Sequence, residues 1–73
     1  MLSLSKIAEE EAVAAYRQAA ATHQAAQLPD SAANCYKLGA ALYSKQQPPN
    51  PRAIPMYEEA AELLMEVSTL VIR

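Results

Sequence analysis

The sequence contains no phenylalanine and no tryptophan, and it has one glycine, one cysteine, one histidine and one aspartate among its 73 residues. One glycine excludes a glycine-rich loop that binds phosphate. A single cysteine excludes an internal disulfide framework and fits a reducing compartment, so we expect a protein of the cytoplasm. No stretch approaches the roughly 18 apolar residues of a membrane span, and the N-terminus lacks the apolar run of a secretory signal. We therefore expect no integral membrane segment.

Charge and length limit the partners and the core. With 6 basic and 8 acidic side chains the net charge is −2, so no overall positive field would attract nucleic acid. The chain allows one domain, residues 1–73, which would bury roughly 60% of the surface that the unfolded chain exposes. Alanine supplies much of the hydrophobic content. The core must therefore combine close alanine contacts with leucine, isoleucine, valine, methionine and four tyrosines.

Hydrophobic periodicity and two breaks that contain proline predict three helices, at about residues 5–27, 31–45 and 52–72. Because the connections are short, neighbouring helices should run antiparallel. The expected fold class is therefore all-α, a three-helix antiparallel unit. The packing face of the first helix is predicted to be a stripe of mostly small residues: Ala8, Ala12, Ala15, Tyr16, Ala19, His23 and Ala26.

The two breaks carry signals for helix starts. In the first, Pro29 ends the first helix, and Asp30 or Ser31 is expected to cap the second. In the second, Asn50 is expected to cap the third helix, with Pro51 as its first residue unless Pro55 delays the start of the regular helix to about residue 54. One face of the third helix should be exposed and acidic, with Glu58, Glu62 and Glu66.

The second and third helices have the layout of a helical hairpin. Small residues at Gly39, Ala53 and Ala60 would let the two helices approach closely. Four larger residues are expected to fill the space between them: Leu38, Leu42, Tyr57 and Leu63.

This stretch resembles a tetratricopeptide repeat. The signature pieces are Leu38-Gly39, an aromatic at Tyr43 one place later than usual, and Ala53, Tyr57 and Ala60 in register. The resemblance implies a module of about one and a half helical hairpins that binds other proteins. A partner protein or peptide is therefore expected, and no cofactor.

An internal correspondence extends the resemblance. Shifting the chain by 41 residues aligns five positions in ten: Ala12 with Ala53, Val13 with Ile54, Tyr16 with Tyr57, Ala19 with Ala60 and Ala20 with Ala61. Long helices with Tyr-x-x-Ala-Ala endings resemble the repeats of soluble NSF attachment proteins, a family of scaffolds related to tetratricopeptide repeats, and that resemblance implies a role in vesicle fusion. The length and three-helix layout also resemble a microtubule interacting and transport domain, which would bind amphipathic peptides in membrane trafficking.

The tetratricopeptide resemblance implies a first partner-binding surface on the second helix. The matching exposed positions are Ala33, Tyr36, Lys37, Ala40, Tyr43 and Ser44. Tyr36, Ala40 and Tyr43 would form one stripe, in which aromatic rings beside a small residue leave a slot for a peptide. In the alternative interpretation, both tyrosines pack inward and reach the surface only with their hydroxyls.

A second candidate surface lies on the third helix, which has more apolar residues than one neighbour can cover. We expect Leu64, Val67, Leu70 and Val71 to contact a partner chain or a second copy, which would make the protein a homo-oligomer. The alternative is a frayed helix end.

Catalysis and metal binding find little support in the sequence. His23 and Cys35 are the sole residues of their kinds, and together they give a small Cys/His-dependent enzyme as a less favoured alternative. Neighbouring glutamates 9–11 point in different directions around a helix, which favours a solvated face over a metal site. We expect a protein interaction module rather than an enzyme, with no metal.

Overall fold

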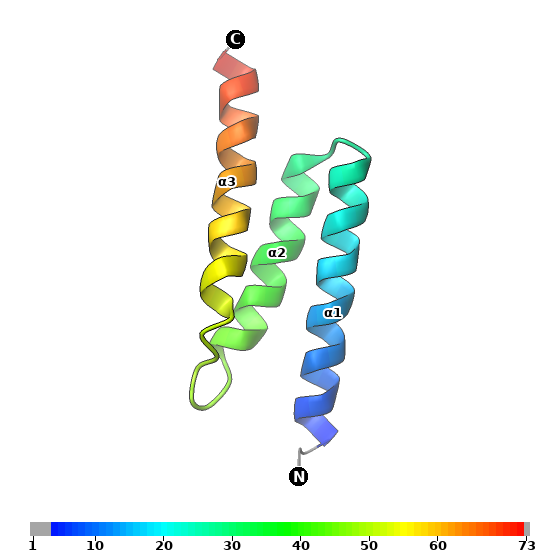
Figure 1. Ribbon diagram of the computed structural model, residues 1–73, viewed down its shortest axis with the longest axis vertical. Coiled ribbons are helices and arrows are strands. Elements are labelled where there is room, and N and C mark those ends of the chain that lie inside the picture. Colours follow the sequence, from blue (N-terminus) through cyan, green and yellow to red (C-terminus); the bar gives the residue numbers. More distant parts are fainter. Residues whose placement is uncertain (1–3, 73) are drawn as a thin grey trace.

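The computed structural model describes the backbone of residues 4–72 and the side chains of residues 7–67. This part of the chain forms three helices, α1 (Leu4–Ala25), α2 (Pro29–Ser44) and α3 (Ala53–Ile72), and no strand (Figure 1). The expected all-α fold of three antiparallel helices is confirmed. In the described part of the chain, no helix has the length and apolar character needed to cross a membrane.

The three helices lie side by side in a flat layer, with α2 in the middle (Figure 1). α2 packs against both α1 and α3, whereas the described backbones of α1 and α3 do not approach each other closely. The Cα atoms extend over 51 × 21 × 11 Å, and the shortest dimension is too small for two stacked layers of helices, whose axes would lie about 8–10 Å apart. α1 and α3 therefore each pack along one side, against the same central helix.

The end of α1 is a Schellman motif. The amide of Leu28 donates to the carbonyl of His23 at 2.8 Å, and the amide of Gln27 donates to the carbonyl of Gln24 at 3.0 Å. Gln27 has a φ of 62°, in the left-handed region where glycine usually stands. The chain thus reverses within three residues, which brings α2 alongside α1.

The start of α2 differs from the expectation. The helix begins at Pro29, and Leu28 precedes it with no side-chain cap. Proline fits this position because the first helical amide has no partner within the helix. The expected cap at Asp30 or Ser31 is therefore wrong, since both residues already lie inside α2.

The start of α3 follows the expectation more closely. The Asn50 Oδ1 atom accepts a hydrogen bond from the amide of Arg52 at 2.9 Å. Regular helix begins two residues after Pro51. Pro55 is tolerated in the first turn because the Pro51 carbonyl, its usual acceptor, accepts from the amide of Ile54 at 3.1 Å.

The buried positions form two clusters, and each cluster takes residues from all three helices. The first contains Val13, Ala40, Tyr43, Ala53 and Met56. The second contains Ala20, Ala32, Ala33, Ala60 and Leu63. Because most of these side chains are alanine, the helices are held by close backbone approach more than by interlocking bulk.

Gly39, on the central helix α2, faces side chains of both α1 and α3. A Cβ atom built on it would lie 2.6 Å from Met56 Cε on α3 and 3.5 Å from Tyr16 Cβ on α1. Gly39, Ala53 and Ala60 are buried, as expected for close approach.

The larger residues expected between α2 and α3 divide into two groups. Leu63 is buried, and Leu42 packs half-buried against the first cluster. Leu38 and Tyr57, by contrast, are each 43% exposed, so their expected place between the helices is wrong. Methionine at residue 56 fills that space instead.

The packing face of α1 also differs from the predicted stripe. The buried residues are Val13 and Ala20, whereas Ala8, Ala15 and Ala26 of the stripe are exposed and its other members are half-buried. The true face is rotated around the helix toward α2, the one neighbour of α1 in the described structure, and the short turn at Gln27 sets the side on which α2 lies.

Candidate partner-binding site

A groove separates α1 from α3, with α2 beneath it, and we call it the α1–α3 groove. It has two hollows. The first, of about 240 Å³, is lined by Arg17, Tyr36, Pro55, Met56 and Glu59. The second, of about 450 Å³, is lined by Gln24, Gln27, Pro29, Leu63 and Glu66. All three helices contribute residues to the α1–α3 groove.

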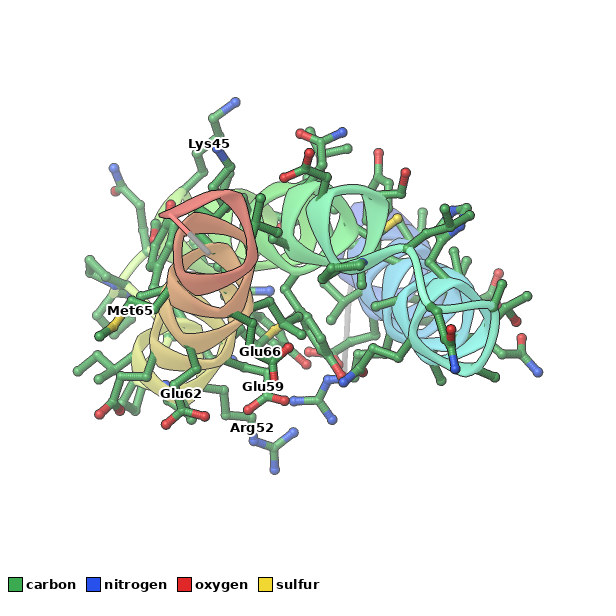
Figure 2. All side chains as sticks on the ribbon, turned by 90° about the horizontal axis from the view of Figure 1, so that it is seen from above. Lys45, Arg52, Glu59, Glu62, Met65 and Glu66 are labelled. Atoms are coloured by element: carbon green, nitrogen blue, oxygen red, sulfur yellow. The ribbon has the colours of Figure 1, made fainter. Side chains whose placement is uncertain are left out.

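The two walls differ in charge. Figure 2 shows Glu59 and Glu66 on the side of α3 that faces α1. Seven residues separate them, which is two helical turns or about 10 Å. The α1 wall presents Arg17 and Gln24, with the same spacing, and carries no acidic residue in either hollow. A negative wall thus faces a wall that is neutral or positive.

The floor of the groove is mostly apolar. Tyr36 lies half-buried across α2, and its hydroxyl donates to Gln24 Oε1 at 3.1 Å, which ties the ring to α1. Met56 and Leu63 are buried at the base of the α3 wall. An apolar floor with a polar rim is the composition of protein interfaces.

The stripe expected on α2 is divided between the groove and the core. Tyr36 reaches the groove, whereas Ala40 and Tyr43 are 0% and 3% exposed, so their expected exposure is wrong. The Tyr43 hydroxyl donates to Glu10 Oε2 at 3.3 Å. The alternative interpretation, inward packing with the hydroxyl reaching outward, describes Tyr43. Ala33 is 0% exposed and lies in the second core cluster, so its expected exposure is wrong too. Lys37 and Ser44 are exposed but line neither hollow.

The surface expected on the third helix is seen in part. Leu64 is 39% exposed and Val67 is half-buried. The side chains of Leu70 and Val71 lie outside the described residues. Whether a partner contacts any of these four remains a prediction.

Leu64 belongs to a longer exposed row on α3, which we call the α3 flank. It consists of Ile54, Tyr57, Ala61 and Leu64, at spacings of three and four residues. Met65 follows it and points away from both α1 and α2 (Figure 2). The flank therefore lies on the opposite side of α3 from the groove glutamates.

The residues considered for catalysis are packing groups. Cys35 is half-buried against the second core cluster, and His23 is half-buried on α1. No hydrogen bond joins the two side chains in the described structure. Within the described residues, no three groups among His, Cys, Asp and Glu gather as metal ligands would. The groove can offer amide, guanidinium and carboxylate groups to a ligand, and no nucleophile next to a base.

Sequence reasoning missed most of the groove residues. Among them are Arg17 and Gln24 on one wall and Glu59 and Glu66 on the other. The usable signal was the seven-residue spacing within each pair, which places both members on one helix face. The sequence predicts an exposed acidic face with Glu58, Glu62 and Glu66, and all three are exposed.

Comparison with known proteins gives one family. The model of the family described as "Soluble NSF attachment protein, SNAP" matches residues 1–70. No curated protein and no solved structure matches the chain significantly. The match agrees with the resemblance carried by the Tyr-x-x-Ala-Ala endings, and nothing supports the resemblance to microtubule interacting and transport domains.

Proposed function

Because this chain belongs to the family of soluble NSF attachment proteins, we propose that it is a non-enzymatic adaptor that binds a partner polypeptide in the α1–α3 groove. The observation that carries this proposal is the composition of the groove. Tyr36, Met56 and Leu63 give it an apolar floor, and polar side chains of opposite helices form its rim. Such a surface suits a polypeptide that inserts apolar side chains and makes hydrogen bonds at its edges.

The charge of the groove favours a partner with basic side chains. Glu59 and Glu66 stand on one wall, two turns apart, and no lysine lines either hollow. Lysines or arginines of a partner helix at a spacing of seven residues would face both carboxylates. Arg17 on the opposite wall could donate hydrogen bonds to one acidic side chain of the partner.

The family description supplies the first partner to test, an NSF protein. With it we propose a role in vesicle trafficking and a cytoplasmic location, which the free Cys35 supports. Contact of the third helix with a partner chain or a second copy is a further part of the proposal. It is supported by the exposure of Leu64.

The test is a binding measurement between the chain and purified NSF, made by biolayer interferometry at two salt concentrations. A double variant, Glu59→Lys with Glu66→Lys, should weaken binding about tenfold, which is about 1.4 kcal/mol. The matched control is Glu58→Lys with Glu62→Lys, which makes the same charge change at exposed positions outside the two hollows. The proposal is contradicted if the unchanged chain does not bind, or if both double variants lose equal affinity.

A further inference from the structure

The α3 flank repeats the surface of α1 that packs against α2. The internal shift of 41 residues places Val13 on Ile54, Tyr16 on Tyr57 and Ala20 on Ala61. In each pair the residue types are the same or closely similar. The two helices therefore carry one pattern of side chains twice.

The two copies of this pattern differ in burial. On α1, Val13 is 1% exposed and Ala20 is 0% exposed, and Tyr16 Cβ lies against the position of Gly39 on α2. On α3, Ile54 is 62% exposed, Tyr57 is 43% exposed and Ala61 is exposed. A surface that is covered by a helix on α1 is thus open to solvent on α3.

The reverse comparison gives the same result. The α3 residues that pack against α2 include Ala53, Met56 and Ala60, and the shift places them on Ala12, Ala15 and Ala19. These three alanines belong to the predicted stripe of α1 and are exposed or half-buried. Each outer helix thus has two packing faces and uses one of them on α2.

We propose that the α3 flank docks a partner helix with the chemistry of α2. Toward α1, α2 presents Tyr36, the small pair Gly39-Ala40, and Tyr43, so a partner helix should carry small residues between two larger ones, at steps of three and four. The argument is continuity with an observed interface, because the flank reproduces the α1 side of the α1–α2 contact. This inference concerns a different face from the α1–α3 groove and does not depend on it.

One difference between the copies defines the partner further. On α1 the hydroxyls of Tyr36 and Tyr43 donate to Gln24 and Glu10. The corresponding positions are Met65 on α3 and Pro51, two residues before α3, and neither residue type carries a carboxylate or amide oxygen in its side chain. The larger residues of the partner helix should therefore be apolar, since a buried hydroxyl without an acceptor is unfavourable.

The probe is a peptide of residues 28–46 with Cys35→Ser, Tyr36→Phe and Tyr43→Phe. A hydrocarbon staple joins the positions of Asn34 and Leu38, which are exposed on α2, so that the probe is helical before binding. It is titrated into the full 15N-labelled chain and followed by NMR. We expect saturable shifts of the amides of the α3 flank, and the same affinity for the variant Glu59→Lys with Glu66→Lys.

Two controls make the result specific. Ala61→Glu should lower the affinity at least tenfold, whereas Ala21→Glu, the same change at an exposed alanine of α1, should leave it unchanged. A probe with Gly39→Leu and Ala40→Leu should not bind. The inference is overturned if the flank shows no saturable shifts, if Ala61→Glu binds as well as the unchanged chain, or if the flank is occupied by a second copy that the probe does not displace.

Discussion

At the scale of single residues, Gln27 holds a conformation that its side chain disfavours. Its φ of 62° lies in the left-handed region, which costs a residue with a Cβ atom roughly 1 kcal/mol. The side chain of Gln27 is exposed, so its removal loses little packing. Gln27→Gly should therefore raise the free energy of unfolding by about 0.5–1 kcal/mol, measured by urea denaturation.

The control for this prediction is the preceding residue. Ala26 is also exposed, but it has no positive φ, so Ala26→Gly should lower the stability through added freedom of the unfolded chain. If both glycine variants changed stability in the same direction, the strain assigned to Gln27 would be refuted.

Gly39 is the residue at which the three helices depend on each other. A valine there would place its Cβ 2.6 Å from Met56 Cε, so the end of the Met56 side chain would have to move, and 3.5 Å from Tyr16 Cβ, which leaves little room for the two methyl groups. Gly39→Val should destabilise the chain by about 2 kcal/mol, as overpacking of a core does. Asn34→Val, at an exposed position of the same helix, controls for the helix propensity of valine.

Thermal unfolding followed by circular dichroism measures both valine variants. Combining Gly39→Val with Met56→Ala should cost less than the two single changes added together, because the second change makes room for the first. Equal effects of valine at residues 34 and 39 would show that the glycine is not needed for close approach.

The burial of a residue could be predicted where its type has one structural explanation at that position. Gly39 had to be buried, because a lone glycine inside a helix is explained by close packing. Tyr36 and Tyr43 could not be told apart, because both have an apolar ring and a polar hydroxyl. Their difference arises from the position of α1, where Gln24 meets one hydroxyl and Glu10 the other.

At the scale of the helices, the connection before α3 depends on Asn50. Its Oδ1 accepts from the amide of Arg52, and its Nδ2 donates to Gln46 Oε1 at 3.1 Å. Asn50→Ala should therefore destabilise the chain by about 1 kcal/mol, the usual contribution of such a cap. Urea denaturation measures the change.

Two further substitutions test whether the loss of stability in Asn50→Ala comes from the lost hydrogen bond to the amide of Arg52. Asn50→Asp keeps the acceptor for Arg52 and should recover most of the stability. Asn34→Ala, at an exposed position inside α2, should leave the stability unchanged or slightly raised. A loss at residue 50 no larger than that at residue 34 would mean that Asn50 does not hold the start of α3.

Helix positions were predictable to within about two residues, because prolines and periodicity mark them locally. The helix start at Pro29 was missed, since proline at the first position competes with a side-chain cap at Asp30, and local pattern does not decide between them. The packing face of α1 was misplaced for a different reason. Its row of alanines is a suitable packing surface, but which side of α1 receives α2 is decided by the short turn at Gln27.

At the scale of the whole molecule, the α1–α3 groove could not be read from the sequence. It exists because α2 separates α1 from α3 in a flat layer. Three amphipathic helices of these lengths could equally close into a bundle in which every helix contacts both others. The repeated side-chain pattern on α1 and α3 was visible in the sequence. The sequence did not show that α2 covers this pattern on α1 and leaves it exposed on α3.

The measurement that tests this open arrangement most directly is small-angle X-ray scattering on the monomer peak of a size-exclusion column, identified by its mass of 7.9 kDa. The flat layer has a Cα radius of gyration of 13.5 Å and one long axis of 51 Å, so the scattering should give a radius of gyration of at least that value and an elongated distance distribution. A compact domain of 73 residues has a radius of gyration of about 11 Å. A value near 11 Å would mean that α1 and α3 close over α2, which would remove the α1–α3 groove and contradict the open arrangement.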